Sequence, residues 1–132
     1  FTSDGPRRVF YYPNGNAITV NNFSSTGGAV RRKPDIAAAD GVKVATPGFS
    51  PFYGTSAAAP HAAAIAALML SAKPDLTVSE VRGVFKNSAF DIEAPGWDRD
   101  SGQGLIMAER VLKEGGWYRS LNGGILELLL GQ

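Results

Sequence analysis

Residues 54–70, GTSAAAPHAAAIAALML, decide how the rest of this 132-residue chain is interpreted. The stretch consists mainly of small and apolar residues, contains no charge, and is followed by Lys73-Pro74. This pattern predicts a helix over Thr55–Ala72 that begins with Thr55 as its cap and stops before the proline. Because such a helix has no polar face, we expect it to be buried in the core.

Ser56 lies in the first turn of this helix, and His61, the only histidine in the chain, follows five positions later. A serine hydroxyl is a poor nucleophile unless a base removes its proton. Five helical residues turn the side-chain direction by about 140° and advance it by about 7.5 Å, so the two side chains point apart. We therefore interpret His61 as a structural histidine, and the free N–H groups of the helix N-terminus as suited to an oxyanion beside Ser56.

Composition limits the classes of function. Thirteen basic and twelve acidic side chains leave a net charge of +1, and no long basic run indicates nucleic acid as a partner. The absence of cysteine excludes disulfides, zinc–thiolate sites and a thiol nucleophile. The longest apolar run, residues 62–70, is shorter than the roughly 20 residues of a transmembrane helix, so we expect no membrane span.

Short strands and two further helices are predicted around the central helix. Residues 8–12 and 17–20 flank Asn14-Gly15 and predict a β-hairpin. Residues 36–39 and 42–46 are candidate buried strands. A second helix runs from a cap at Thr77 or Ser79 to about Asn87, and a third covers residues 106–114 before Gly115-Gly116.

The eight residues GTSAAAPH, 54–61, resemble the nucleophile segment Gly-Thr-Ser-x-x-x-Pro-His of subtilisin-like serine peptidases, the subtilases or peptidase family S8. Residues 1–6, FTSDGP, are similar to the family's Phe-Ser-Ser-x-Gly turn. Residues 33–42, KPDIAAADGV, are similar to its Lys-Pro-Asp-Ile-x-Ala-Pro-Gly-Val segment. Asp40 stands where the family has proline, and we expect this departure to alter only the loop. With further matches at residues 73–77 and 91–106, the resemblance covers roughly residues 1–113.

The resemblance implies a serine endopeptidase that hydrolyses peptide bonds through an acyl-enzyme on Ser56, with the Ser56 N–H as one oxyanion donor and no cofactor or metal. In this family the catalytic Asp, the catalytic His and the oxyanion Asn all precede the turn at which this chain begins. None of these roles is therefore assigned to a residue here, and we expect the isolated chain to be inactive.

The fold that the resemblance implies is α/β, a partial subtilisin-like three-layer fold with a mostly parallel sheet on the alanine-rich helix and with C-terminal helices. Residues 1–114 would form the C-terminal part of the peptidase domain, with an inserted hairpin at about 8–30, and residues 115–132 an unassigned tail. The expected partners are a polypeptide substrate of the intact enzyme and the missing N-terminal part of the domain. Secretion or export is expected from the resemblance alone.

Two alternatives stay open. A sedolisin-type peptidase shares the Gly-Thr-Ser nucleophile but uses a Glu base and a calcium loop, to which Asp91, Asp98 and Asp100 bear a loose likeness, whereas Pro60-His61 favours the subtilisin type. A non-catalytic pseudo-peptidase or interaction module could retain the fold and bind a partner through residues 125–130. An α/β-hydrolase needs glycine at 58 and a Ser-x-x-Lys enzyme needs lysine at 59, and both positions are alanine.

Overall fold

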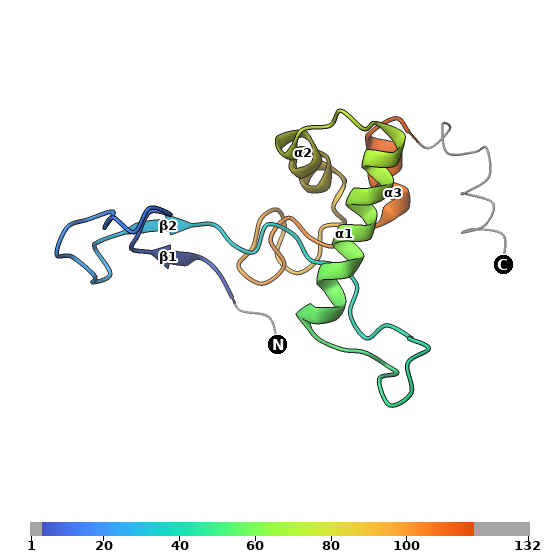
Figure 1. Cartoon of the computed structure of the whole chain (residues 1–132), viewed down its shortest axis with the longest axis horizontal. Coiled ribbons are helices and arrows are strands. Elements are labelled where there is room, and N and C mark those ends of the chain that lie inside the picture. Colours follow the sequence, from blue (N-terminus) through green and yellow to red (C-terminus); the bar gives the residue numbers. More distant parts are fainter. Residues whose placement is uncertain (1–3, 118–132) are drawn as a thin grey trace.

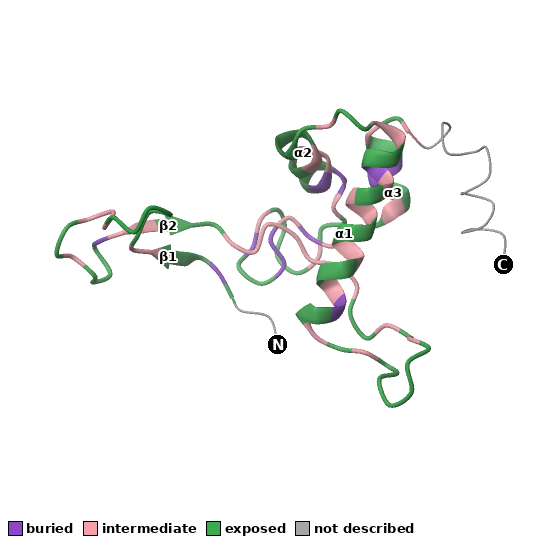
Figure 2. Ribbon diagram, viewed as in Figure 1, coloured by how far each residue is buried: buried purple, intermediate pink, exposed green. Residues whose placement is uncertain are grey.

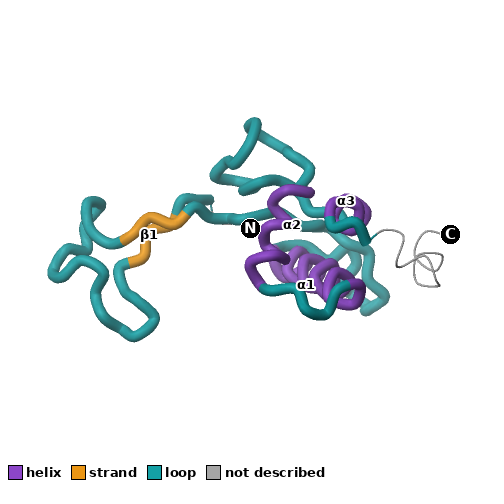
Figure 3. The backbone as a smooth tube through the Cα atoms, turned by 90° about the horizontal axis from the view of Figure 1, so that it is seen from above, coloured by secondary structure: helices purple, strands orange, loops and turns teal. Residues whose placement is uncertain are grey.

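The computed structural model describes residues 4–117, which form a body of three helices and a β arm that extends away from it (Figure 1; Figure 3). The elements in chain order are β1 (Arg7–Val9), β2 (Ala29–Arg31), α1 (Thr55–Ala72), α2 (Val78–Ser88) and α3 (Ala108–Glu114). Residues 1–3 of the predicted N-terminal turn, and the tail segment 125–130, lie outside the described residues.

Helix α1 has the predicted bounds, but its cap differs from the prediction. Gly54, not Thr55, is the N-cap residue, and no side chain accepts a hydrogen bond there. Gly54 has φ 97° and ψ 175°, a conformation that is essentially restricted to glycine because a Cβ atom would strain it. At the other end, Lys73 adopts an extended backbone, since a residue before proline disfavours the helical region.

Helices α2 and α3 also lie close to their predicted positions. The cap of α2 is Thr77, whose Oγ1 accepts from the Glu80 N–H at 3.2 Å while Glu80 Oε2 accepts from the Thr77 N–H at 2.8 Å. This reciprocal pair is a capping box. Helix α3 begins at Ala108, two residues later than predicted, because Ile106 is still extended and donates its N–H to the Ala37 carbonyl at 3.0 Å.

The core lies where the three helices meet. Met69, Phe85, Ile106 and Val111 form one buried cluster, against which partly buried side chains of α1 and α2, together with Ile36 and Ala38, pack. Most of the remaining helix surface is intermediate or exposed (Figure 2). The hydrophobic core is therefore small, and segment 36–38 is one of its walls.

Extended segments in the body meet at single bridges. Ala37 pairs in parallel with Leu105, and Leu105 pairs antiparallel with Phe90. The pairing does not continue because Gly104 has φ 109° and α3 starts soon after Ile106. The three helices and these bridged segments form a partial α/β fold. The predicted mostly parallel sheet is present in residues 4–117 only as the Ala37–Leu105 bridge. The predicted strands 36–39 and 42–46 are likewise reduced to one bridged residue each, Ala37 and Val42.

The expectation that α1 is buried all round is wrong for the described chain. Only Ala57 and Met69 of its residues are buried, and Leu70 is 41% exposed. Neighbouring segments cover the helix on part of its circumference only (Figure 1). With 18 residues and a mean hydropathy of 1.3, α1 is long and apolar enough to cross a membrane by length and composition, a test that core helices of soluble proteins also pass. It thus presents apolar surface that residues 4–117 leave uncovered.

In the arm, β1 pairs antiparallel with β2, and Arg7 lies opposite Arg31. The predicted hairpin turn is present, with a bridge between Tyr11 and Ala17 around Asn14-Gly15. The predicted strand 17–20 is wrong beyond its first residue. The chain bends from Ile18 on, and a turn in which the Thr19 carbonyl accepts the Asn22 N–H at 3.2 Å, with Asn21 at φ 58°, ends the extended segment.

Candidate active site

Ser56 is the second residue of α1 and is exposed to solvent. The Gly54 carbonyl accepts from the Ala57 N–H at 2.8 Å and from the Ala58 N–H at 3.3 Å. The N–H and the hydroxyl of Ser56 have no hydrogen-bond partner within residues 4–117. A free N–H at a helix N-terminus favours negative charge, so this turn can stabilise an anion next to the serine hydroxyl.

His61 does not serve Ser56 in this structure. Its Nδ1 lies 2.8 Å from the carbonyl oxygen of Ala57, one turn earlier in the same helix, and its side chain is partly buried. The imidazole ring is therefore held against its own helix. This agrees with the five-residue spacing of Ser56 and His61, which predicts that their side chains point apart. Within the described part of the chain no side chain forms a hydrogen bond with the Ser56 hydroxyl, so these residues hold a nucleophile candidate without a base bonded to it.

Asp40 contacts the turn that carries Ser56, although its sequence position predicts an effect on its own loop only. Its Oδ1 accepts from the Gly41 N–H and from the Gly54 N–H, both at 2.7 Å. The second bond connects the loop after residues 36–39 with the residue that caps α1. Asp-Gly indicates a turn, but no local signal in the sequence identifies a distant N–H that the carboxylate will accept.

A groove of about 410 Å³ lies between the first turns of α1 and residues 34–40. It is lined by Pro34, Ile36, Ala37, Ala38, Asp40, Gly54, Thr55, Ala58, Ala59, Ala62 and Asp100. The alanines of α1 leave this space open because their side chains are short. Ser56 is not among the lining residues, so its hydroxyl lies beside the groove and not within it.

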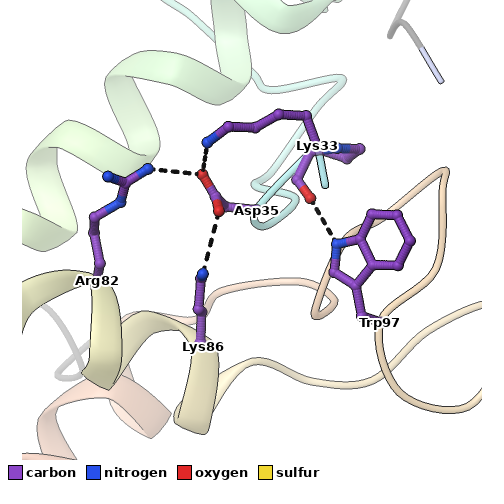
Figure 4. A network of polar contacts seen from close by, with 6 residues as sticks. Lys33, Asp35, Arg82, Lys86 and Trp97 are labelled. Atoms are coloured by element: carbon purple, nitrogen blue, oxygen red, sulfur yellow. Dashed lines mark hydrogen bonds and ion pairs between the residues drawn. The ribbon is translucent and has the colours of Figure 1, made fainter. Parts of the chain in front are cut away.

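One wall of the groove is anchored to α2 through Asp35 (Figure 4). The carboxylate of Asp35 accepts from Lys33, from Arg82 at 3.0 Å and from Lys86 at 3.3 Å. Partial burial would raise the pKa of Asp35, but hydrogen bonds from these three cations outweigh it and lower the pKa to about 2. Next to it, Trp97 Nε1 donates to the Pro34 carbonyl at 3.0 Å. These contacts fix the segment that leads to Asp40.

Of the three aspartates that bear a likeness to a calcium loop, Asp91 and Asp98 accept hydrogen bonds in their own turns, whereas the Asp100 carboxylate forms an ion pair with Arg99 at 3.7 Å. Asp91 accepts from the Gly96 N–H at 2.8 Å. Asp98 Oδ1 accepts from the N–H groups of Asp100 and Ser101 at 2.7 and 2.6 Å, and hydrogen bonds from Ser101 lower the pKa of Asp98. Across residues 4–117, no group of three or more possible ligands is arranged to hold a metal ion.

Several curated proteins share sequence with this chain, and two of them give the following matches. Fervidolysin of Fervidobacterium pennivorans is 37% identical over 62 residues, which are 47% of this chain and 9% of that protein. The extracellular serine protease of Serratia marcescens is 35% identical over 83 residues, which are 63% of this chain and 8% of that protein. The matched part of the chain thus covers less than a tenth of the length of each of these relatives.

The crystal structure of fervidolysin, described as a keratinolytic enzyme related to subtilisin, aligns with 46% of this chain and 9% of its own, at 38% identity and a TM-score of 0.45. The sequence model of the subtilase family, peptidase S8, matches residues 10–104. That match covers more than half of the chain and includes Ser56, His61 and the whole of α1. The chain therefore belongs to the subtilase family.

Proposed function

We propose that this chain carries the nucleophile of a serine endopeptidase and that Ser56 is that nucleophile. The observation that supports this role best is the geometry at the start of α1, where Ser56 is exposed two residues after Gly54, whose backbone conformation is restricted to glycine. Membership of the subtilase family supports the same role.

In the proposed reaction the Ser56 hydroxyl oxygen attacks the carbonyl carbon of a peptide bond while a base takes its proton. The oxyanion of the tetrahedral intermediate accepts a hydrogen bond from the free Ser56 N–H. The intermediate collapses to an ester on Ser56 as the base returns the proton to the leaving amine. Water, activated by the same base, then attacks the ester and releases the acid.

The base, the carboxylate that orients it and a second oxyanion donor are proposed to come from another segment of the peptidase domain. His61 cannot supply the base because its ring is held by the Ala57 carbonyl of its own helix. A triad without its base keeps only the catalysis that comes from binding and from the oxyanion hole, so the chain alone should be inactive.

The substrate is proposed to be a polypeptide. Export is proposed because one relative is an extracellular protease.

A labelling experiment tests this role. The purified chain is incubated with a fluorophosphonate probe, alone and after mixing with a polypeptide that supplies the preceding part of a subtilase catalytic domain. We expect labelling only in the mixture, at least about a thousandfold faster than in the chain alone. Ser56→Ala should abolish it. Ser71→Ala, which changes an exposed serine of the same helix, should leave it unchanged.

Rapid labelling of the chain alone would refute the need for a second segment. Labelling that survives Ser56→Ala would refute the assignment of the nucleophile. A mixture that forms a complex but is never labelled would favour a non-catalytic subtilase-like module.

A further inference from the structure

The β1–β2 arm is basic and contains no carboxylate. Between Gly5 and Pro34 the chain has four arginines and one lysine, but neither Asp nor Glu. Two of the arginines have partners in the structure. Arg8 donates to the Gly27 carbonyl, and the Arg32 guanidinium lies 5.2 Å from the ring centroid of Trp97. The guanidinium groups of the other two, Arg7 and Arg31, have no such partner among residues 4–117.

Arg7 and Arg31 are direct cross-strand neighbours in the antiparallel register. Both side chains are exposed, and neither guanidinium group has a hydrogen-bond or ion-pair partner within residues 4–117. Directly opposite side chains share one face of a ribbon, with Cβ atoms about 4.5–5.5 Å apart, and like charges placed in this way destabilise the pair. An anion bound to both guanidinium groups would remove this repulsion.

The acidic residues that flank the arm in sequence do not supply this anion. Asp4 forms an ion pair with Arg99. Asp35 is surrounded by Lys33, Arg82 and Lys86 in the body (Figure 4). Both carboxylates are therefore already paired, so neither of the acidic residues that flank the arm neutralises Arg7 and Arg31.

The backbone of the arm is suited to a polypeptide in particular. A two-stranded ribbon has two outer edges, and apart from the β1–β2 ladder the backbone groups of residues 7–9 and 29–31 form no hydrogen bonds to other described residues. Such an edge can accept an extended peptide as a further strand. Its alternate side chains would then lie on the same face as the two arginines.

Exposed aromatic side chains lie farther along the arm. Tyr11 and Phe23 stack with ring centroids 5.5 Å apart and are 56% and 52% exposed. Phe10 meets Phe23 edge to face at 5.8 Å. The arm projects from the helices in two perpendicular views, so these side chains are accessible to a partner without any change in the body (Figure 1; Figure 3).

We propose that the Arg7–Arg31 face of the arm is a docking surface for an extended acidic segment of a polypeptide. The guanidinium groups bind its carboxylates, and one strand edge binds its backbone. This role is independent of Ser56 and needs no catalysis.

Fluorescence anisotropy with three labelled probes tests the docking surface: a peptide that alternates Glu and Val, the same peptide with Gln for Glu, and oligothymidylate. We expect the acidic peptide to bind the whole chain at least about tenfold more tightly than its Gln analogue, and more weakly as salt rises. Arg7→Gln and Arg31→Gln should each weaken binding by about tenfold. The control Lys43→Gln removes the same charge from an exposed lysine in another loop and should change binding less than about twofold.

Circular dichroism of each variant checks that the helices are unchanged. As a second measurement, an acidic peptide with a photo-reactive group should cross-link to residues 7–12 or 29–31. Equal losses in Arg7→Gln and Lys43→Gln would overturn the site, and so would cross-links confined to the helices. Tighter binding of oligothymidylate than of the acidic peptide would overturn the choice of a polypeptide.

Discussion

Replacing Asp35 by asparagine tests how much the anchor between residues 33–35 and α2 contributes to stability. Asparagine keeps the size of the side chain but leaves Lys33, Arg82 and Lys86 around a neutral group. The folded-state pKa of Asp35 is about 2, against an ordinary value of 3.8. At about 1.36 kcal/mol for each pKa unit, ionisation of Asp35 stabilises the folded chain by at most about 2.4 kcal/mol.

The measured effect should be smaller because solvent screens the three cations. The side chains of Lys33, Arg82 and Lys86 are 38%, 57% and 45% exposed. We therefore expect Asp35→Asn to lower the free energy of unfolding by about 1–2 kcal/mol at pH 7 and low salt. Urea unfolding followed by circular dichroism measures this difference, and 1 M salt should reduce it.

The lowered pKa of Asp35 also determines how its contribution to stability changes with pH. Because the pKa of Asp35 is lowered in the folded state, its contribution is complete above pH 3.8 and is lost as the pH falls towards 2. The difference between the wild type and Asp35→Asn should shrink over the same range. Asp75→Asn, at an exposed aspartate without a partner among the described residues, should change stability by less than about 0.5 kcal/mol. Equal effects of the two variants at pH 7, or a difference that persists at pH 2, would refute the reasoning.

Three further predictions concern the caps of α1 and α2. Gly54→Ala should destabilise the chain by about 1–3 kcal/mol in urea unfolding, because φ 97° with ψ 175° strains any other residue. Gly83→Ala, in the middle of α2 with open space around it, should instead stabilise it by about 0.5–1 kcal/mol, and equal signs would contradict this explanation. Asp40→Ala should slow fluorophosphonate labelling in the reconstituted enzyme. Asp40→Asn, which keeps an acceptor for the Gly54 N–H, should retain most of the rate. Identical labelling rates in the two variants would show that this bond does not position Ser56. Thr77→Ala should lower the melting temperature through a loss of about 0.5–2 kcal/mol, and an unchanged melting temperature would mean that the capping box contributes nothing.

The sequence by itself determined the features that depend on neighbouring residues. The bounds of α1 follow from a run of small residues between Gly54 and Lys73-Pro74. The cap of α2 was limited by the sequence to Thr77 or Ser79, and the structure has Thr77, which forms a capping box with Glu80 three residues later. The position of Ser56 in the first turn of α1 was predictable for the same reason, since torsion preferences and capping act within a few residues along the chain.

Only the tertiary structure decided which distant segments meet. Residues 29–31, and not 17–20, pair with β1, because the turn at residues 19–22 redirects the chain. Asp40 reaches Gly54 across fourteen positions, and Asp35 gathers cations from its own segment and from α2. The exposure of α1 was likewise not predictable from its sequence. A helix without charges indicates burial, but the actual burial depends on which segments pack around it. Contacts of this kind depend on how long loops close and on what surrounds each element, and local preferences do not encode either.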